Sequence, residues 1–204
     1  MIKAAIFDIG NVLITHSLGS IDFCNELGID KERYDEFINK WLTTLGLGEI
    51  NEDQYWSQFA EEFTVAGQNA SKDLFIKAFA SSLEINQEMP TFIRKLKGKG
   101  LRLAVLSNTI PSHADHLRQL GVYTGFDEVY LSYEVGLRKP DLRLYKLVLE
   151  KLGIKAQEGI YVDDQIENVQ AALQLGIHGI CFNVRTESPE SLEKQIQKLI
   201  DNAN

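Results

Sequence analysis

A short apolar segment near the N-terminus, Ala4 to Phe7, ends directly at an acidic residue, Asp8. An unbroken apolar run of this kind is typical of a parallel strand that is buried on both faces. A carboxylate at the end of such a strand costs free energy unless a cation or hydrogen-bond donors accompany it. Ligands of open α/β sheets bind at this edge, beyond the carboxyl ends of the strands. Asp8 is therefore the first candidate for a functional residue.

Buried strands and helices alternate through the second half of the chain. Further strands are expected at 101–106, 128–132, 159–162 and 179–182, and helices at 91–98, 113–120, 140–152, 166–175 and 188–200. Strands that alternate with helices of this length predict right-handed crossovers and a parallel sheet. The expected fold class is α/β, a Rossmann-like parallel sheet with flanking helices and a helical insertion.

The insertion, which we call the helical region, occupies residues 16–88. Its apolar residues follow helical spacing, Asn51 is expected to cap one helix, and no strand is expected between about 15 and 88. The chain is thus divided into a core, 1–15 and 89–204, and the helical region. The aromatic residues of this region are expected to form its own core. Three of them offer an alternative, a stacking face for a sugar: Trp41, Tyr55 and Trp56.

Composition argues against several classes of function. The 204 residues carry a formal net charge of −8, whereas nucleic acid binding needs a basic surface. Cys24 and Cys181 form no CxxC motif, so we expect buried thiols in a reducing compartment. Asp8 interrupts the N-terminal apolar run, and no run approaches the roughly 18 residues of a membrane span. We expect a soluble cytoplasmic protein with no membrane partner, and no feature predicts an oligomer.

Polar residues stand at or just beyond the ends of the first four strands. They are Asp8, Ser107, Lys139 (one loop further on) and the pair Asp163 and Asp164. A parallel sheet brings these ends to one edge, where neighbouring carboxylates repel each other unless a cation binds. Carboxylate oxygens suit Mg²⁺, and a lysine and a serine beside the ion favour a phosphate. An aspartate held there can attack phosphorus and form an aspartyl-phosphate. Each residue taken alone could also be a helix cap or a surface charge.

These residues lie in four motifs that resemble those of the haloacid dehalogenase (HAD) superfamily of phosphohydrolases. The motifs are FDIGNVL at 7–13, LSN at 106–108, GLRKPD with Lys139, and YVDDQIENVQAALQLGI at 161–177. The combination is most similar to the branch that contains bacterial alpha-D-glucose 1-phosphate phosphatases, and the phosphatase domains of bifunctional epoxide hydrolases are also similar. Because the superfamily carries a helical cap after its first motif, the resemblance implies that 16–88 is a cap domain.

The resemblance implies roles in phosphoryl transfer for four residues. Asp8 would be the nucleophile and a ligand of Mg²⁺. Ser107 would bind the transferring phosphoryl group, helped by the backbone of Asn108. Lys139 would neutralise Asp8 and the phosphate.

The resemblance also implies how a metal would be held. Asp164 would be the second carboxylate ligand, and Gly10 would supply its backbone carbonyl. Asp163 would not bind the metal itself but would support the residues that do. Asn168 would orient Lys139 or a water on the metal.

One position departs from the family pattern. The usual first motif is DxDGT or DxDGV, and its second Asp, the general acid and base, is replaced here by Gly10. Such a group is worth roughly 10²–10⁴ in rate. Three consequences are open: a preference for leaving groups that need little protonation, such as an anomeric sugar oxygen or a phenol; substitution by another group, with His16 the nearest in sequence; or a slow or inactive protein. We favour the first, and expect His113 and His116 to be structural or solvated.

The expected function is a Mg²⁺-dependent phosphatase for a small phosphorylated metabolite, such as a sugar 1-phosphate. Its cap would close on hinges at 14–17 and 86–90 and exclude water. A metal-free 2-haloacid dehalogenase also lacks the second Asp, but it has no need of the pair Asp163 and Asp164. A regulatory or binding protein on a disabled phosphatase fold is the non-enzymatic alternative, with Gly10 as the disabling change. A phosphomutase is disfavoured because shuttling a phosphoryl group depends on the missing acid.

Overall fold

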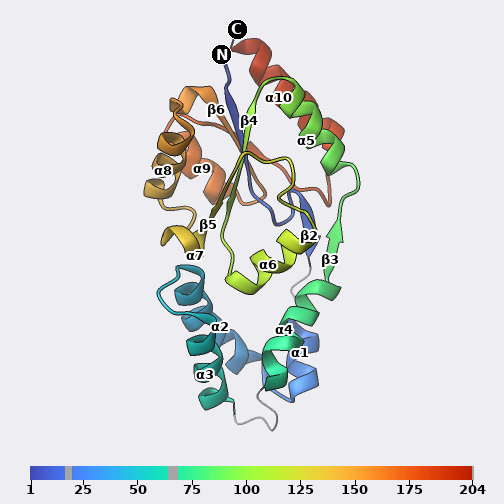
Figure 1. The fold of residues 1–204 in the computed structure, drawn as a ribbon, viewed down its shortest axis with the longest axis vertical. Coiled ribbons are helices and arrows are strands. Elements are labelled where there is room, and N and C mark those ends of the chain that lie inside the picture. Colours follow the sequence, from blue (N-terminus) through green and yellow to red (C-terminus); the bar gives the residue numbers. More distant parts are fainter. Residues whose placement is uncertain (17–19, 64–68, 204) are drawn as a thin grey trace.

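The computed structural model describes residues 1–16, 20–63 and 69–203, and within them five strands form one parallel sheet (Figure 1). These strands are β1 Ala4–Phe7, β4 Arg102–Ser107, β5 Glu128–Leu131, β6 Gly159–Asp163 and β7 His178–Cys181. All were expected, and the sheet order is β5-β4-β1-β6-β7. Because β1 is central, the residue that follows it, Asp8, is flanked by the ends of β4 and β6.

Helices cover both faces of the sheet (Figure 1). They are α5 Met89–Gly98 and α10 Pro189–Asn202 on one face, and α8 Leu142–Leu152 and α9 Ile166–Gln174 on the other. Successive side chains of a strand point to opposite faces. Ala5 and Phe7 therefore join the apolar cluster with α5 and α10, whereas Ala4 and Ile6 join the cluster with α8 and α9. Burial on both faces explains why β1 shows no alternation of polar and apolar residues.

Three short elements complete the α/β part of the described chain. They are helix α6 Pro111–Gln119, the four-residue helix α7 Ser132–Val135, and the 3-10 helix η1 Ala156–Glu158. Helix α8 begins two residues later than expected, at Leu142, because the Asp141 side chain caps it by accepting the Arg143 N–H at 2.9 Å. Ser132, expected at the end of a strand, instead begins α7.

The helical region contains α1 Ser20–Leu27, α2 Lys31–Gly46, α3 Glu52–Glu62 and α4 Asn69–Ser81. These helices surround their own apolar cluster, which includes Phe23, Phe37, Tyr55 and Phe59, so the expectation that the aromatic residues form a core is confirmed. Asn51 caps α3, as predicted. Its side chain accepts the Gln54 N–H at 2.9 Å, and the Gln54 side chain oxygen accepts the Asn51 N–H at 2.9 Å.

The expectation of no strand between about 15 and 88 is wrong. Strand β2, Ile14–His16, pairs antiparallel with β3, Leu83–Ile85. The two chain segments that join the helical region to the sheet are therefore hydrogen bonded to each other through this ribbon, and only the second expected hinge, 86–90, lies wholly outside it. Strands of three residues are too short to show the alternation by which a strand is predicted from sequence.

The two cysteines differ in exposure. Cys24 is buried, as expected, whereas Cys181 is exposed because it lies on β7, at the edge of the sheet. Among the residues that the structure describes, no helix has the length and apolarity needed to cross a membrane.

Candidate functional site

The ends of three neighbouring strands bring the predicted residues together. Asp8 follows β1, Ser107 is the last residue of β4, and Asp163 is the last residue of β6, with Asp164 next. The Asp8 N–H donates to the Val162 carbonyl at 2.9 Å, which holds the start of the first motif against β6. One cavity is lined by Asp8, Gly10, Ser107, Asn108, Lys139, Asp164 and Asn168.

Lys139 connects two acids at the centre of this edge. Its Nζ lies 2.7 Å from Asp8 Oδ1 and 2.8 Å from Asp163 Oδ2, and all three residues are buried. Burial and the nearby Asp163 raise the pKa of Asp8 to about 6, although Lys139 opposes the shift. Burial alone would lower the pKa of Lys139, but the two acids outweigh it and the pKa is raised. The lysine therefore stays charged while Asp8 titrates close to neutral pH.

Asp163 is surrounded by hydrogen-bond donors from the protein. Besides Lys139, its oxygens accept bonds from the Tyr161 hydroxyl, from the Gln165 N–H at 2.8 Å, and from Asn168 Nδ2 at 3.1 Å to each oxygen. A carboxylate has about four lone-pair sites, so these donors fill it. Asp163 thus holds the Lys139 ammonium in position. Asn168 contacts Asp163, the carboxylate that also accepts a bond from Lys139.

Asp164 lies in a more open position than Asp163 and has a partner that sequence reasoning did not single out. Asn11 Nδ2 donates to Asp164 Oδ2 at 3.0 Å, and Arg185 Nε donates to Asn11 Oδ1 at 3.1 Å. Asn11 has φ 53°, a left-handed conformation that Asn tolerates better than most residues. The signal in the sequence is an Asn directly after Gly10, because both residue types favour turns.

The carboxylates of Asp8, Asp163 and Asp164 offer oxygens that all lie within 4.8 Å of one another. Lys139 pairs with Asp8 and Asp163 and brings one positive charge to a group of three acids, so the group has an excess of negative charge. Because the Asp163 oxygens are occupied by protein donors, Asp8 and Asp164 are the carboxylates able to hold a cation. Oxygen ligands of this type suit a hard divalent ion, so the residues present fit Mg²⁺.

The end of β4 offers groups that suit an anion. Ser107 is the last residue of β4 and lines the same cavity as Lys139. The side chain of Asn108 accepts the Lys139 N–H at 2.9 Å and donates to the Lys139 carbonyl at 3.0 Å, which fixes the lysine loop against the end of β4. Ser132, which was not predicted, holds the segment that follows β4, because its Oγ accepts the Thr109 N–H at 3.0 Å and donates to the Thr109 carbonyl at 3.1 Å.

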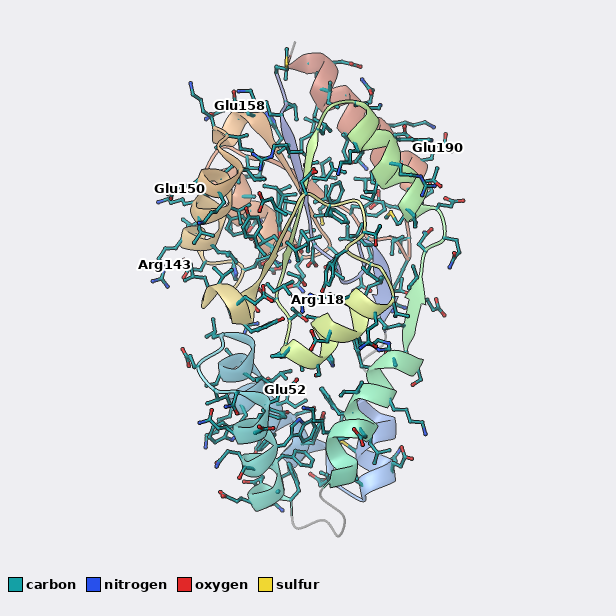
Figure 2. The ribbon with its side chains drawn as sticks, in the orientation of Figure 1. Glu52, Arg118, Arg143, Glu150, Glu158 and Glu190 are labelled. Atoms are coloured by element: carbon teal, nitrogen blue, oxygen red, sulfur yellow. The ribbon has the colours of Figure 1, made fainter. Side chains whose placement is uncertain are left out.

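The helical region covers this edge of the sheet, and the cavity between them has a volume of about 660 Å³. Hydrogen bonds on two sides join the parts. Glu52 of α3 accepts the Ser112 N–H of α6 at 2.8 Å (Figure 2), and within the helical region it also pairs with Lys72 of α4 at 2.9 Å. On the other side, Arg138 donates to Thr43 of α2 at 2.8 Å.

The predicted aromatic and histidine candidates have separate outcomes. None of the described side chains of Trp41, Tyr55 and Trp56 lines the cavity, so a sugar-stacking role for them is not supported.

The His113 ring lies flat on Phe79, with centroids 3.7 Å apart, and it also lines the cavity. The backbone of His16 lies in β2, but its side chain is outside what the structure describes.

A parallel sheet with a buried aspartate, a lysine and an acidic pair at its carboxyl edge is the arrangement of an α/β enzyme with a carboxylate nucleophile. The family model for haloacid dehalogenase-like hydrolases matches residues 2–176. The chain therefore belongs to the haloacid dehalogenase-like hydrolase family, as its motifs predicted.

Known proteins resemble the chain over most of its length. A sesquiterpene phosphatase from Aspergillus oryzae is 30% identical, covering 87% of this chain and 88% of that protein. A HAD-like family hydrolase structure from Porphyromonas gingivalis has a TM-score of 0.83 and 25% identity, covering 97% of this chain and 98% of that one. A HAD family enzyme from Bacteroides thetaiotaomicron, in complex with magnesium and inorganic phosphate, has a TM-score of 0.76 and 23% identity, covering 88% and 93%. This last likeness shows the fold.

Proposed function

We propose that the chain is a Mg²⁺-dependent phosphatase that hydrolyses a small phosphorylated metabolite through an aspartyl-phosphate on Asp8. The observation that carries the proposal is the Lys139 ammonium, buried between Asp8 Oδ1 at 2.7 Å and Asp163 Oδ2 at 2.8 Å beside Ser107 and Asp164. Membership of the hydrolase family and the similarity to a sesquiterpene phosphatase support phosphatase chemistry.

The proposed metal ligands are the carboxylates of Asp8 and Asp164 and the backbone carbonyl of Gly10. A bound Mg²⁺ would supply charge to neutralise the phosphoryl oxygens and the excess carboxylates. Asn11 would keep Asp164 aimed at the site, and Asp163 would hold Lys139 in place. The magnesium found in the Bacteroides neighbour is consistent with this assignment.

In the proposed reaction, an Asp8 carboxylate oxygen attacks phosphorus while the bond to the organic oxygen breaks. Lys139 and Ser107 bind the phosphoryl oxygens as this group moves, and the organic group leaves with the bonding electrons. Water then attacks phosphorus of the aspartyl-phosphate, the bond from phosphorus to the Asp8 oxygen breaks, and inorganic phosphate leaves with the Asp8 carboxylate regenerated. The proton lost by this water passes to solvent, which supplies the proton taken up by the departed organic oxygen. Asn108 holds Lys139 in register with Ser107 through both steps.

Gly10 at the position of the usual acid and base restricts the leaving group. Without a proton donor there, substrates whose organic oxygen departs easily are favoured. An anomeric sugar oxygen, as in a sugar 1-phosphate, and a phenol both meet this requirement. The same residue supports the second candidate, a catalytically impaired regulatory or binding protein, and turnover decides between the two.

The helical region is proposed to act as a cap domain, 16–88, over a core of 1–15 and 89–204. The Glu52 and Thr43 contacts would hold it closed over the cavity, and the paired strands β2 and β3 would serve as its stalk. A closed cap excludes water while the phosphoryl group is transferred to Asp8.

The test is phosphate release from p-nitrophenyl phosphate and a panel of phosphate monoesters, with Mg²⁺ or with EDTA. Asp8→Asn is compared with Asp201→Asn, a change of the same kind at an exposed position of α10. We expect turnover that needs Mg²⁺, survives Asp201→Asn and falls by about 10³-fold or more with Asp8→Asn. Mg²⁺ binding with no turnover on any substrate would contradict the proposal and favour the regulatory candidate.

A further inference from the structure

The cavity above Asp8 has two chemically different ends. At the sheet it is lined by the charged and polar groups already described. Away from the sheet its wall is made by carbon-rich side chains from α1, α2, α4 and the segment before α6: Phe23, Ile38, Leu42, Phe75, Phe79 and Ile110. At about 660 Å³ the cavity has the volume of a site for a whole small molecule rather than for phosphate alone.

Most of the polar side chains on this wall already have partners within the protein. Lys31 Nζ pairs with Asp35 Oδ1 at 2.6 Å, and Thr43 Oγ accepts a bond from Arg138 at 2.8 Å. Among the described residues of the helical region, Asn39 and Tyr34 are the other polar residues that line the cavity. A sugar buries several hydroxyl groups, and each one costs free energy unless a partner receives it. The wall is therefore poorly suited to a sugar.

Four of the six apolar residues on this wall are less covered than core residues. Ile38, Leu42, Phe75 and Phe79 are half-buried, whereas the other two, Phe23 and Ile110, are buried. Phe59, at the centre of the cluster of the helical region, is 1% exposed. The free energy of the complex falls when an apolar ligand displaces water from apolar surface in a cavity. The cavity thus pairs an anion site at one end with an uncovered apolar surface at the other.

We propose that the substrate is a phosphate monoester of an apolar alcohol or phenol, with the phosphate at Asp8 and the carbon skeleton against α1, α2 and α4. The inference rests on the proposed phosphatase function and narrows its substrate class. Aryl and isoprenyl groups are both apolar enough to pack against this wall. They differ as leaving groups, because a phenol needs a proton less than an aliphatic alcohol does and Gly10 supplies none.

The first test measures kcat/KM with Mg²⁺ for linear alkyl phosphates of increasing length, together with naphthyl phosphate, geranyl phosphate and glucose 1-phosphate. Each added methylene should raise kcat/KM about two- to fourfold until the wall is covered. Naphthyl phosphate should exceed geranyl phosphate in kcat if the leaving group limits the rate. Glucose 1-phosphate is compared by KM, because its anomeric oxygen departs more easily than an alkyl oxygen, and its KM should be at least about tenfold higher than that of the longer alkyl phosphates. Equal kcat/KM values along the alkyl series, or a KM for glucose 1-phosphate as low as that of the longer alkyl phosphates, would overturn the inference.

A matched pair of variants locates the effect in the wall. Leu42→Asn on α2 should flatten the dependence on chain length, chiefly through KM, whereas Leu173→Asn, at a 51% exposed position of α9 away from the cavity, should leave the series unchanged. Leu42→Ala, which keeps the wall apolar but shorter, gives a smaller flattening if Leu42→Asn disturbs folding. Unaltered chain-length dependence in both Leu42 variants would overturn the inference. Absence of phosphate release from every ester, p-nitrophenyl phosphate included, would instead overturn the proposed function, and this inference with it.

Discussion

Removal of the Lys139 ammonium is the perturbation whose size follows most directly from the structure. Lys139 is 3% exposed and contacts Asp8 and Asp163 at 2.7 and 2.8 Å. Lys139→Met keeps the length of the side chain and removes its charge, so two buried carboxylates then face each other without a cation. Breaking a buried ion pair in this way costs about 3–5 kcal/mol of folding free energy. We expect Lys139→Met to lower Tm of the metal-free protein by about 6–20 °C at pH 8.

The control uses an ion pair of the same length at the surface. Lys3 Nζ lies 2.7 Å from Glu158, but its side chain is 53% exposed. Exposed pairs contribute about 0–1 kcal/mol, so Lys3→Met should lower Tm by less than about 4 °C. Differential scanning calorimetry measures Tm of the two variants and of the unmodified protein with EDTA present. Both variants remove the same ammonium group, so the difference between their shifts in Tm reports the effect of burial.

The pH dependence gives a second check on the cause. Loss of the lysine removes the influence that lowers the pKa of Asp8, so this pKa should rise above its present value of about 6. Asp8 is then largely protonated at pH 5, and the repulsion with Asp163 is relieved. The penalty of Lys139→Met should therefore be smaller at pH 5 than at pH 8. Equal shifts for Lys139→Met and Lys3→Met, or a penalty independent of pH, would refute the argument from burial.

Three other predictions concern the metal and the closed cavity. The rise in Tm that Mg²⁺ produces should shrink as pH falls below about 6, because a protonated Asp8 is a poor ligand; a rise that stays constant from pH 8 to pH 5 would contradict this. Calorimetric titration should show weaker Mg²⁺ binding by about 10–100-fold in Asn11→Gly, which tolerates φ 53° but loses the bond to Asp164, and an unchanged affinity would exclude a positioning role for Asn11. Glu52→Ala should increase amide hydrogen exchange at the start of α6, because the Ser112 N–H loses its acceptor; unchanged exchange there would show that this contact does not hold the cavity closed.

The core of the fold was predictable because its signals are local. Buried parallel strands are short apolar runs, and their ends are marked by Asp8, Ser107 and the pair Asp163 and Asp164. A parallel sheet places such ends together whatever the loops between them do. The pairing of β2 with β3 was not predictable, because it joins residues about seventy positions apart in segments too short for a pattern.

The hydrogen-bond partners and exposure of individual side chains could not be predicted from the sequence. Two adjacent acids, Asp163 and Asp164, differ only in what surrounds them, and the donors around Asp163 come from β6, α9 and the Lys139 loop. The exposure of Cys181 follows from the position of β7 at the sheet edge, which spacing does not reveal. Helical spacing likewise places Leu42 on the apolar face of its helix. It does not reveal that the side chain lines a cavity and does not lie at the centre of the apolar cluster.

The central claim, nucleophilic attack by Asp8, is tested most directly by detecting the phosphorylated enzyme. The protein is mixed with Mg²⁺ and a substrate that it turns over, quenched in acid within the first turnover, digested, and analysed by mass spectrometry. We predict one added phosphoryl group on the peptide that contains Asp8, removed by hydroxylamine, and absent with EDTA or in Asp8→Asn. Rapid phosphate release with no phosphoryl group on that peptide, retained in Asp8→Asn, would contradict the account.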